Sequence, residues 1–158
     1  MVCMGNLCRS PMAEAVLRAK LERAGLGRQV AVDSAGTHGF QRGSRPDPRA
    51  VAQAGRRGYL LGSLKSRPLA VADFSRFDLL LAMDHSNLAA LKTRCPPEHQ
   101  HRLALLLPFD AAAPTDEVPD PYFGSVEGFD AALDLIEPAC DGLLVHLGTR
   151  LARVSEPL

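Results

Sequence analysis

The sequence contains no tryptophan, only eight tyrosines and phenylalanines together, and no net charge. Its basic residues are not interleaved with aromatic side chains, and no nucleic-acid-binding motif is present. No hydrophobic run approaches the roughly 20 residues that a membrane-spanning helix requires, and no signal peptide is recognisable. We therefore expect neither a nucleic-acid partner nor a membrane span, and secretion is disfavoured.

Cysteines are few and scattered. Cys3, Cys8, Cys95 and Cys140 form no Cys-x-x-Cys pair, and no histidine cluster accompanies them, so no metal site is predicted. Unpaired thiols are typical of a reducing compartment, and we expect a cytoplasmic protein. The 158 residues fit one domain, 1–158. A domain of this size buries about 68–70% of the surface of its unfolded chain and needs no disulfide.

The balanced charge hides an asymmetry along the chain. Residues 1–70 carry 12 lysines and arginines against 4 acidic residues, whereas residues 71–158 carry 6 against 14. Two interpretations remain open at this point. The charges are segregated by chance within one globule, or the basic half gathers around an anion-binding site.

Hydrophobic spacing and turn residues predict alternating helices and strands. A strand is expected to end at Val2, and further strands are expected over 29–32, 77–83 and 102–107. Helices are expected over 10–24 with Ser10 as N-cap, over 47–57, over 84–92, and over 126–151 with a kink at Pro138. Residues 40–48 and 109–124 are predicted to be loops. This alternation predicts an α/β fold, a three-layer sandwich in which a short twisted parallel sheet of about four strands carries helices on both faces.

The segment Cys3–Arg9 lies between the first strand and the first helix. Such a loop directs several backbone N–H groups into one concavity at a helix N-terminus, which favours an anion. Gly5 and Asn6 tolerate the left-handed backbone that such a loop needs. Arg9 adds a planar fork of donors. A cysteine at this position is suited to act as a nucleophile toward phosphorus.

Each of these residues also has an ordinary explanation. Cys-x5-Arg arises by chance in a chain with four cysteines, and a lone cysteine such as Cys8 is most often a small buried hydrophobe. Asp120, which precedes a proline, could simply form a turn. The combination of Cys, Gly-Asn, Arg and Ser-Pro in one loop is more specific than any of its parts, and it predicts phosphate chemistry.

The stretch Cys3-Met-Gly-Asn-Leu-Cys-Arg-Ser-Pro-Met-Ala-Glu closely resembles the active-site loop of the low-molecular-weight protein tyrosine phosphatases. The resemblance covers essentially the whole chain, since residues 33–37 (DSAGT), 83–88 (MDHSNL) and 120–124 (DPYFG) resemble later motifs of the family in the same order. It implies the family's flavodoxin-like fold and hydrolysis of phosphotyrosine and other aryl phosphates. The expected partners are phosphotyrosine proteins, a bacterial tyrosine kinase among them.

The resemblance implies a two-step mechanism that uses no metal and no cofactor. Cys3 attacks phosphorus to form a cysteinyl-phosphate, and Arg9 with the loop N–H groups holds the phosphoryl oxygens. Asp120 protonates the leaving phenolate and then activates the water that hydrolyses the intermediate. Phosphate and substrate are expected to be bound by the loop and by the walls of a deep slot, namely Met4, Gly5, Asn6, Leu7, Cys8, Ser10, Phe40, Tyr122 and Phe123.

Further roles follow from the same resemblance. Ser10 would donate a hydrogen bond to the sulfur of Cys3, and Asn6 and Ser34 would together hold the shape of the loop. Leu7 favours phosphotyrosine, because phosphoarginine-directed relatives tend to carry threonine at this place. Cys8 is a candidate for a reversible disulfide with Cys3 that protects the nucleophile from further oxidation.

Two features depart from the family pattern. Only Met1 and Val2 precede Cys3, so we expect a shortened first strand and a chain start recorded too far downstream. Adding an upstream apolar segment is expected to raise the melting temperature by several degrees. Leu64 stands where many relatives carry a histidine that supports the loop asparagine, so Asn6 is expected to depend more on Ser34 or on water.

Two other functions remain open. An arsenate reductase on the same scaffold shares the loop but needs additional resolving cysteines, and neither Cys95 nor Cys140 forms a close pair in the sequence. A weakly active phosphate-binding regulatory protein is the other alternative, should the first strand really be so short.

Overall fold

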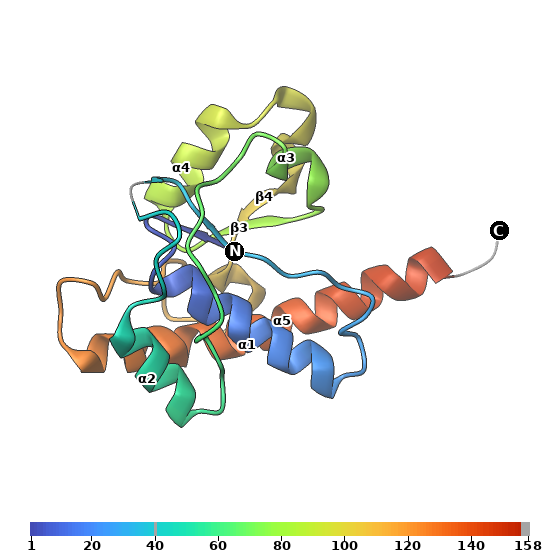
Figure 1. The fold of residues 1–158 in the computed structure, drawn as a ribbon. Coiled ribbons are helices and arrows are strands. Elements are labelled where there is room, and N and C mark those ends of the chain that lie inside the picture. Colours follow the sequence, from blue (N-terminus) through green and yellow to red (C-terminus); the bar gives the residue numbers. More distant parts are fainter. Residues whose placement is uncertain (40, 156–158) are drawn as a thin grey trace.

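The computed structural model describes residues 1–39 and 41–155, so Phe40 lies outside the described residues (Figure 1). The elements in chain order are β1 (Val2–Cys3), α1 (Arg9–Arg23), β2 (Ala35–Gly36), α2 (Pro48–Arg56), α3 (Asp73–Arg76), β3 (Leu80–Ala82), α4 (His85–Arg94), η1 (Pro97–Arg102), β4 (Leu103–Leu105), η2 (Leu107–Phe109) and α5 (Val126–Ser155). The label η marks short 3-10 helices.

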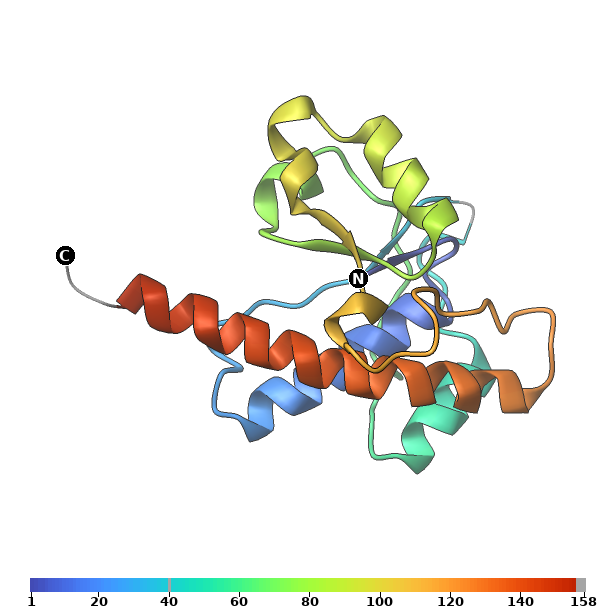
Figure 2. The ribbon, with the colours of Figure 1, turned by 180° about the vertical axis from the view of Figure 1, so that it is seen from behind.

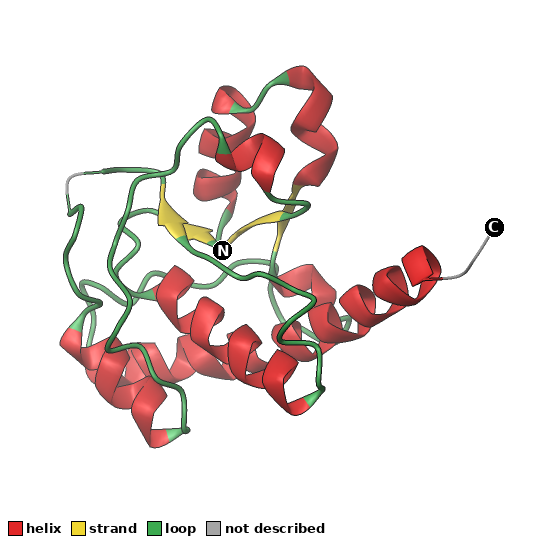
Figure 3. Ribbon diagram, turned by 45° about the vertical axis from the view of Figure 1, so that its right-hand side comes forward, coloured by secondary structure: helices red, strands yellow, loops and turns green. Residues whose placement is uncertain are grey.

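The sheet consists of four short parallel strands in the order β2-β1-β3-β4 (Figure 3). Val2 of β1 is in register with Ala35 of β2 on one side and Ala82 of β3 on the other. Although β1 has only two residues, it occupies an interior position and is paired on both edges. Because all strands are parallel, the loops that follow β1 and β3 leave the same edge of the sheet.

Helices cover both faces of this sheet, which confirms the predicted three-layer α/β fold (Figures 1 and 2). Strand residues alternate between the two faces. Cys3 and Leu81 belong to the core formed with α1, α2 and α5. Val2 and Leu80 belong to a second core, formed with α3 and α4. The last turns of α5 extend beyond the other helices (Figure 2).

Several predicted boundaries were wrong. Residues 29–32 form turns and irregular chain rather than a strand, because β1 begins at Val2 and no residue of β1 lies opposite them. Helix α1 begins at Arg9 with Cys8 as N-cap, so Ser10 lies inside the first turn and does not cap it. The helices predicted over 47–57 and 84–92 correspond to α2 and α4, whose N-caps Asp47 and Asp84 accept hydrogen bonds from backbone N–H groups. The short helices α3 and η1 were not predicted.

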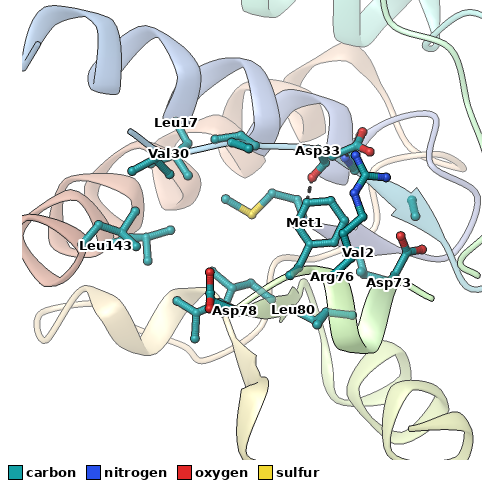
Figure 4. Close-up of a pocket in the computed structure, with 18 of the residues that line it drawn as sticks. Met1, Val2, Leu17, Val30, Asp33, Asp73, Arg76, Asp78, Leu80 and Leu143 are labelled. Carbon is teal, nitrogen blue, oxygen red and sulfur yellow. Dashed lines mark hydrogen bonds between the residues drawn. The ribbon is translucent and has the colours of Figure 1, made fainter. Parts of the chain in front are cut away.

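A cavity lies beside the first residue of β1, at the end of the sheet away from the Cys3 loop (Figure 4). It is a groove of about 460 Å³ between β1, β3, residues 29–35 and the second half of α5. The Met1 amino group donates a hydrogen bond of 3.0 Å to the carbonyl oxygen of Asp33 at this point. Burial lowers the pKa of that amino group below its usual value.

Candidate active site

The loop between β1 and α1 turns its carbonyl groups outward. The oxygens of Cys3, Met4 and Leu7 accept hydrogen bonds of 2.9, 3.0 and 2.8 Å from N–H groups of residues 37, 38 and 47. Within residues 1–39 and 41–155, the N–H groups of residues 5–8 donate to no protein acceptor. The loop therefore presents a set of free N–H donors at the N-terminus of α1, where an anion is favoured.

Asn6 holds this loop in a conformation that few residues adopt. Its φ of 56° is the only positive φ of a non-glycine residue in the described part of the chain. Its side-chain amide donates to the hydroxyls of Ser10 at 2.8 Å and Ser34 at 2.9 Å. Its Oδ1 accepts from the backbone N–H of Arg67 at 3.0 Å. Gly5 does not have a positive φ, so only Asn6 supplies the left-handed residue that the sequence suggested for both.

Glu14 extends the same network and was not predicted. The hydroxyl of Ser34 donates to its carboxylate at 2.5 Å, and Arg18 pairs with it at 2.6 Å. Burial raises the pKa of Glu14, while the hydrogen bond from Ser34 opposes that shift. Leu64 packs against the apolar core instead of joining the network. The side chain of Asn6 thus contacts the hydroxyl of Ser34 and the backbone N–H of Arg67.

The sulfur of Cys3 contacts a hydroxyl group of helix α1. Its Sγ is 3.0 Å from the hydroxyl oxygen of Ser10. Because Ser10 is in the first turn of α1 and also accepts a hydrogen bond from Asn6, its own proton is free to point toward sulfur. This arrangement suits a sulfur that carries negative charge.

Arg9 is almost fully buried, and its guanidinium faces two carboxylates. Its Nη1 donates to Asp84 at 2.6 Å and to the carbonyl oxygen of Val118 at 3.0 Å. Its Nη2 is 3.4 Å from Asp120. Asp84 follows β3, so the parallel sheet brings it to the same edge as the Cys3 loop. The sequence placed Asp84 only at the start of the helix expected over 84–92, and its role as the partner of Arg9 was missed.

Asp120 lies at the opening of the site. Its side chain is 41% exposed, and its Oδ1 accepts a hydrogen bond of 3.1 Å from the N–H of Tyr122. This bond forms the turn that was the ordinary explanation of the residue. The other oxygen, Oδ2, faces Arg9. Asp120 therefore forms the turn and also places a carboxylate oxygen in the site.

A cavity of about 160 Å³ opens above the loop. Its lining consists of Cys3, Met4, Gly5, Leu7, Cys8, Arg9, Gln41, Asp120, Tyr122 and Phe123. Nine of the predicted substrate-binding or catalytic residues are in this set, that is, all of them except Asn6, Ser10 and Phe40. Asn6 and Ser10 lie behind the loop as its supports, and Phe40 falls outside the described residues. Gln41 lines the cavity and was not predicted.

Cys8 lines the same cavity, but its thiolate form, which a nucleophile requires, is disfavoured. Burial, helped by the nearby Asp47 carboxylate, raises the pKa of its thiol to about 12. All four cysteines are free thiols. A reversible disulfide between Cys3 and Cys8 stays a prediction.

In the described part of the chain, one group of side chains could hold a metal ion. His85, Asp116 and Glu117 bring one ligand atom each within 4.8 Å of one another. Their side chains are about half exposed, and none of them lines the cavity above Cys3.

Comparisons with known proteins agree with this geometry. A family model described as low molecular weight phosphotyrosine protein phosphatase matches residues 1–154. A low molecular weight protein-tyrosine-phosphatase of Streptomyces coelicolor is 45% identical over 90% of this chain and 88% of its own. A crystal structure of a protein tyrosine phosphatase from Entamoeba histolytica, with Hepes in its active site, superposes with a TM-score of 0.91 at 38% identity and covers 94% of each chain.

A second solved structure is also similar to this chain. A Drosophila arginine phosphatase superposes with a TM-score of 0.84 at 33% identity, covering 92% of this chain and 94% of its own.

The described residues contain no helix that is long and apolar enough to span a membrane. The chain belongs to the low molecular weight phosphotyrosine protein phosphatase family.

Proposed function

We propose that this phosphatase hydrolyses phosphotyrosine through a phosphoryl group carried on Cys3. The observation that carries the proposal is that Cys3, the loop residues 5, 7 and 8 with their free N–H groups, and Arg9 line one small cavity. An anion that enters this cavity meets donors on several sides, and the sulfur lies at its base. Phosphoryl transfer depends mainly on such positioning and on charge stabilisation.

In the first step, Cys3 attacks phosphorus while the bond to the phenolic oxygen breaks. Asp120 donates a proton to that oxygen, which matters because a phenolate with a pKa near 10 is a poor leaving group. In the second step, Asp120 accepts a proton from water as water attacks phosphorus and the bond to sulfur breaks. The Ser10 hydroxyl, 3.0 Å from Cys3 Sγ, stabilises the departing thiolate.

The shape of the cavity supports an aromatic substrate. Tyr122 and Phe123 make an edge-to-face contact with ring centroids 4.9 Å apart and both line the opening. Leu7 presents an aliphatic side chain to the same space. An apolar wall favours a phenyl ring over the charged guanidino group of phosphoarginine, and a shorter phosphoserine would not reach Cys3.

The arsenate reductase alternative has less support. A disulfide relay requires a second cysteine that can approach the first. Cys95 belongs to the other core, on the opposite face of the sheet from Cys3. Burial raises the pKa of Cys140 to about 12, so its reactive thiolate form is disfavoured. No observation favours a merely regulatory phosphate-binding role.

The biological setting is proposed on the chemistry alone. Phosphatase activity implies phosphoprotein substrates, and a tyrosine kinase that phosphorylates itself is a suitable one. Four free thiols, including the nucleophile, fit a reducing compartment such as the cytoplasm.

The test is hydrolysis of p-nitrophenyl phosphate with a chelator present, followed by a comparison of phosphotyrosine, phosphoserine and phosphoarginine peptides. We expect turnover without added metal, a preference for phosphotyrosine, and no turnover by Cys3→Ser. Residual activity of Cys3→Ser near the parent level would overturn the assignment of the nucleophile. Thiol-dependent turnover of arsenate with no phosphatase activity would favour the reductase.

A further inference from the structure

Arg49, in the first turn of α2, contacts the segment that carries Asp120. Its Nη2 donates a hydrogen bond of 2.9 Å to the carbonyl oxygen of Tyr122, and its Nη1 donates one of 3.1 Å to that of Gly124. The guanidinium carbon also lies 5.8 Å from the centre of the Tyr122 ring. A single planar group therefore holds two carbonyls and one ring of the same turn.

The other side of the guanidinium is fixed to the beginning of α2. Arg49 donates to both carboxylate oxygens of Asp47, through Nε at 3.1 Å and through Nη2 at 2.9 Å. Asp47 is the N-cap of α2, and its own backbone N–H donates to the carbonyl oxygen of Leu7 at 2.8 Å. Leu7 is part of the phosphate-binding loop. A continuous chain of hydrogen bonds thus joins that loop to the segment with Asp120.

The Asp120 segment has few other attachments. Residues 119–125 contain neither helix nor strand, and Asp120, Tyr122 and Phe123 are exposed. Within the described chain, the hydrogen bonds that tie this segment to elements other than α5 come from Arg9 and Arg49. Arg9 contacts the Asp120 carboxylate at 3.4 Å, but the guanidinium of Arg9 must also bind phosphate. Arg49 is therefore the residue that holds the backbone of this segment.

We propose that Arg49 is a positioning residue that holds the Asp120 segment over the Cys3 loop, so that the carboxyl group meets the leaving oxygen. This inference rests on the proposed function, in which Asp120 is the general acid. A proton donor displaced by about 1 Å loses much of its effect on the rate. Protonation contributes most to the rate when the leaving group is a poor one. Loss of Arg49 should therefore lower kcat/KM more for a substrate with a poor leaving group than for one with a good leaving group.

The experiment measures kcat/KM for phenyl phosphate and for p-nitrophenyl phosphate, whose leaving group is far more acidic. For Arg49→Ala we expect kcat/KM to fall about tenfold with phenyl phosphate and about twofold or less with p-nitrophenyl phosphate. Arg49→Lys keeps the charge but not the planar fork, and should give an intermediate loss with the same selectivity. It also carries the test if Arg49→Ala does not fold. Arg56→Ala, an exposed arginine of the same helix, is the matched control and should leave both values unchanged.

A double-mutant comparison separates positioning from a general loss of structure. In an Asp120→Asn background the carboxyl group is already absent, so Arg49→Ala should change kcat/KM for phenyl phosphate by less than about twofold. Equal losses for both substrates, or full additivity with Asp120→Asn, would overturn the positioning role. If the parent enzyme hydrolyses neither substrate, the proposed function itself fails, and the inference fails with it.

Discussion

Replacement of Asp84 by asparagine tests how the buried charge of Arg9 is balanced. Asp84 does two things, since its Oδ1 caps α4 through the N–H of Asn87 at 2.7 Å and its Oδ2 pairs with Arg9 at 2.6 Å. Asparagine is an equally good N-cap, so Asp84→Asn removes the charge while the cap is kept. Arg9 would be left with the carbonyl of Val118 and the longer contact to Asp120.

The magnitude follows from the burial of the pair. Removing one partner of a fully buried ion pair costs about 3–5 kcal/mol. The Arg9 side chain is 3% exposed but that of Asp84 is 18% exposed, so we expect the smaller value of about 2–3 kcal/mol after allowance for solvent. For a domain of this size each kcal/mol shifts the melting temperature by about 2–4 °C, so a decrease of several degrees is expected.

Phosphate should reverse part of this loss, because a bound dianion supplies the charge that Arg9 lacks in the variant. The assay is thermal unfolding of the parent and Asp84→Asn with and without inorganic phosphate. The increase in melting temperature on adding phosphate should be larger for the variant. An unchanged melting temperature, or an equal phosphate effect in both proteins, would refute the reasoning that Asp84 balances Arg9.

Three further predictions concern other parts of the structure. A Cβ on Gly142 would clash with the backbone oxygen of Phe109, whereas one on Gly148 would meet nothing within 4 Å. Gly142→Ala should therefore lower the free energy of unfolding by about 1–3 kcal/mol, and Gly148→Ala should raise it by about 0.5–1 kcal/mol. Urea titrations that give both changes the same sign would contradict this. Hydrogen bonds from Arg49 lower the pKa of Asp47. The Asp47 carboxylate therefore stabilises the fold at pH values above its unfolded pKa near 3.9. This stabilisation is lost as the pH falls through the lower pKa of the folded state. Asp47→Asn should accordingly be less stable than the parent at neutral pH, with a difference that shrinks below about pH 4; a difference independent of pH would be inconsistent with the ion pair. Because the pKa of Cys8 is about 12, iodoacetamide at neutral pH should label Cys3 and leave Cys8 unmodified by mass spectrometry, and equal labelling would show that the thiols do not differ.

The sequence predicted the part of the site that lies within one short segment. Cys3, Asn6, Arg9 and Ser10 lie within eight residues, and a loop between a strand and a helix constrains their relative positions strongly. The start of α4 was predicted for the same reason, since an Asp before a helix acts on residues two or three positions away.

The contacts that were missed join residues far apart in the sequence. Arg9 and Asp84 are 75 residues apart, and Arg49 reaches carbonyl groups 73 and 75 residues away. Such pairs depend on which strands are neighbours, and strand order was not predicted. A backbone carbonyl as acceptor leaves no trace in the residue type, so the contacts of Arg49 had no sequence signal. Asp84 had one, because it directly follows a buried strand whose end lies beside the Cys3 loop.

The strand expected over 29–32 failed for a related reason. The short apolar run at 30–32 is typical of a strand, but a strand also requires a partner in register. β1 pairs with Ala35 and Gly36 instead, and the side chains before them line the groove of about 460 Å³. Local propensity was outweighed by the position of the neighbouring strand.

The central claim is that the phosphoryl group is transferred from the substrate to the sulfur of Cys3. Trapping this covalent intermediate tests the claim most directly. Asp120→Asn, which lacks the base for the second step, would be mixed with p-nitrophenyl phosphate, quenched in acid, digested and analysed by mass spectrometry. The account predicts one added phosphoryl group on the peptide that contains Cys3 and none on that peptide in Cys3→Ser. Turnover by the parent enzyme with no phosphorylated Cys3 in the variant, or with the phosphoryl group on another residue, would contradict it.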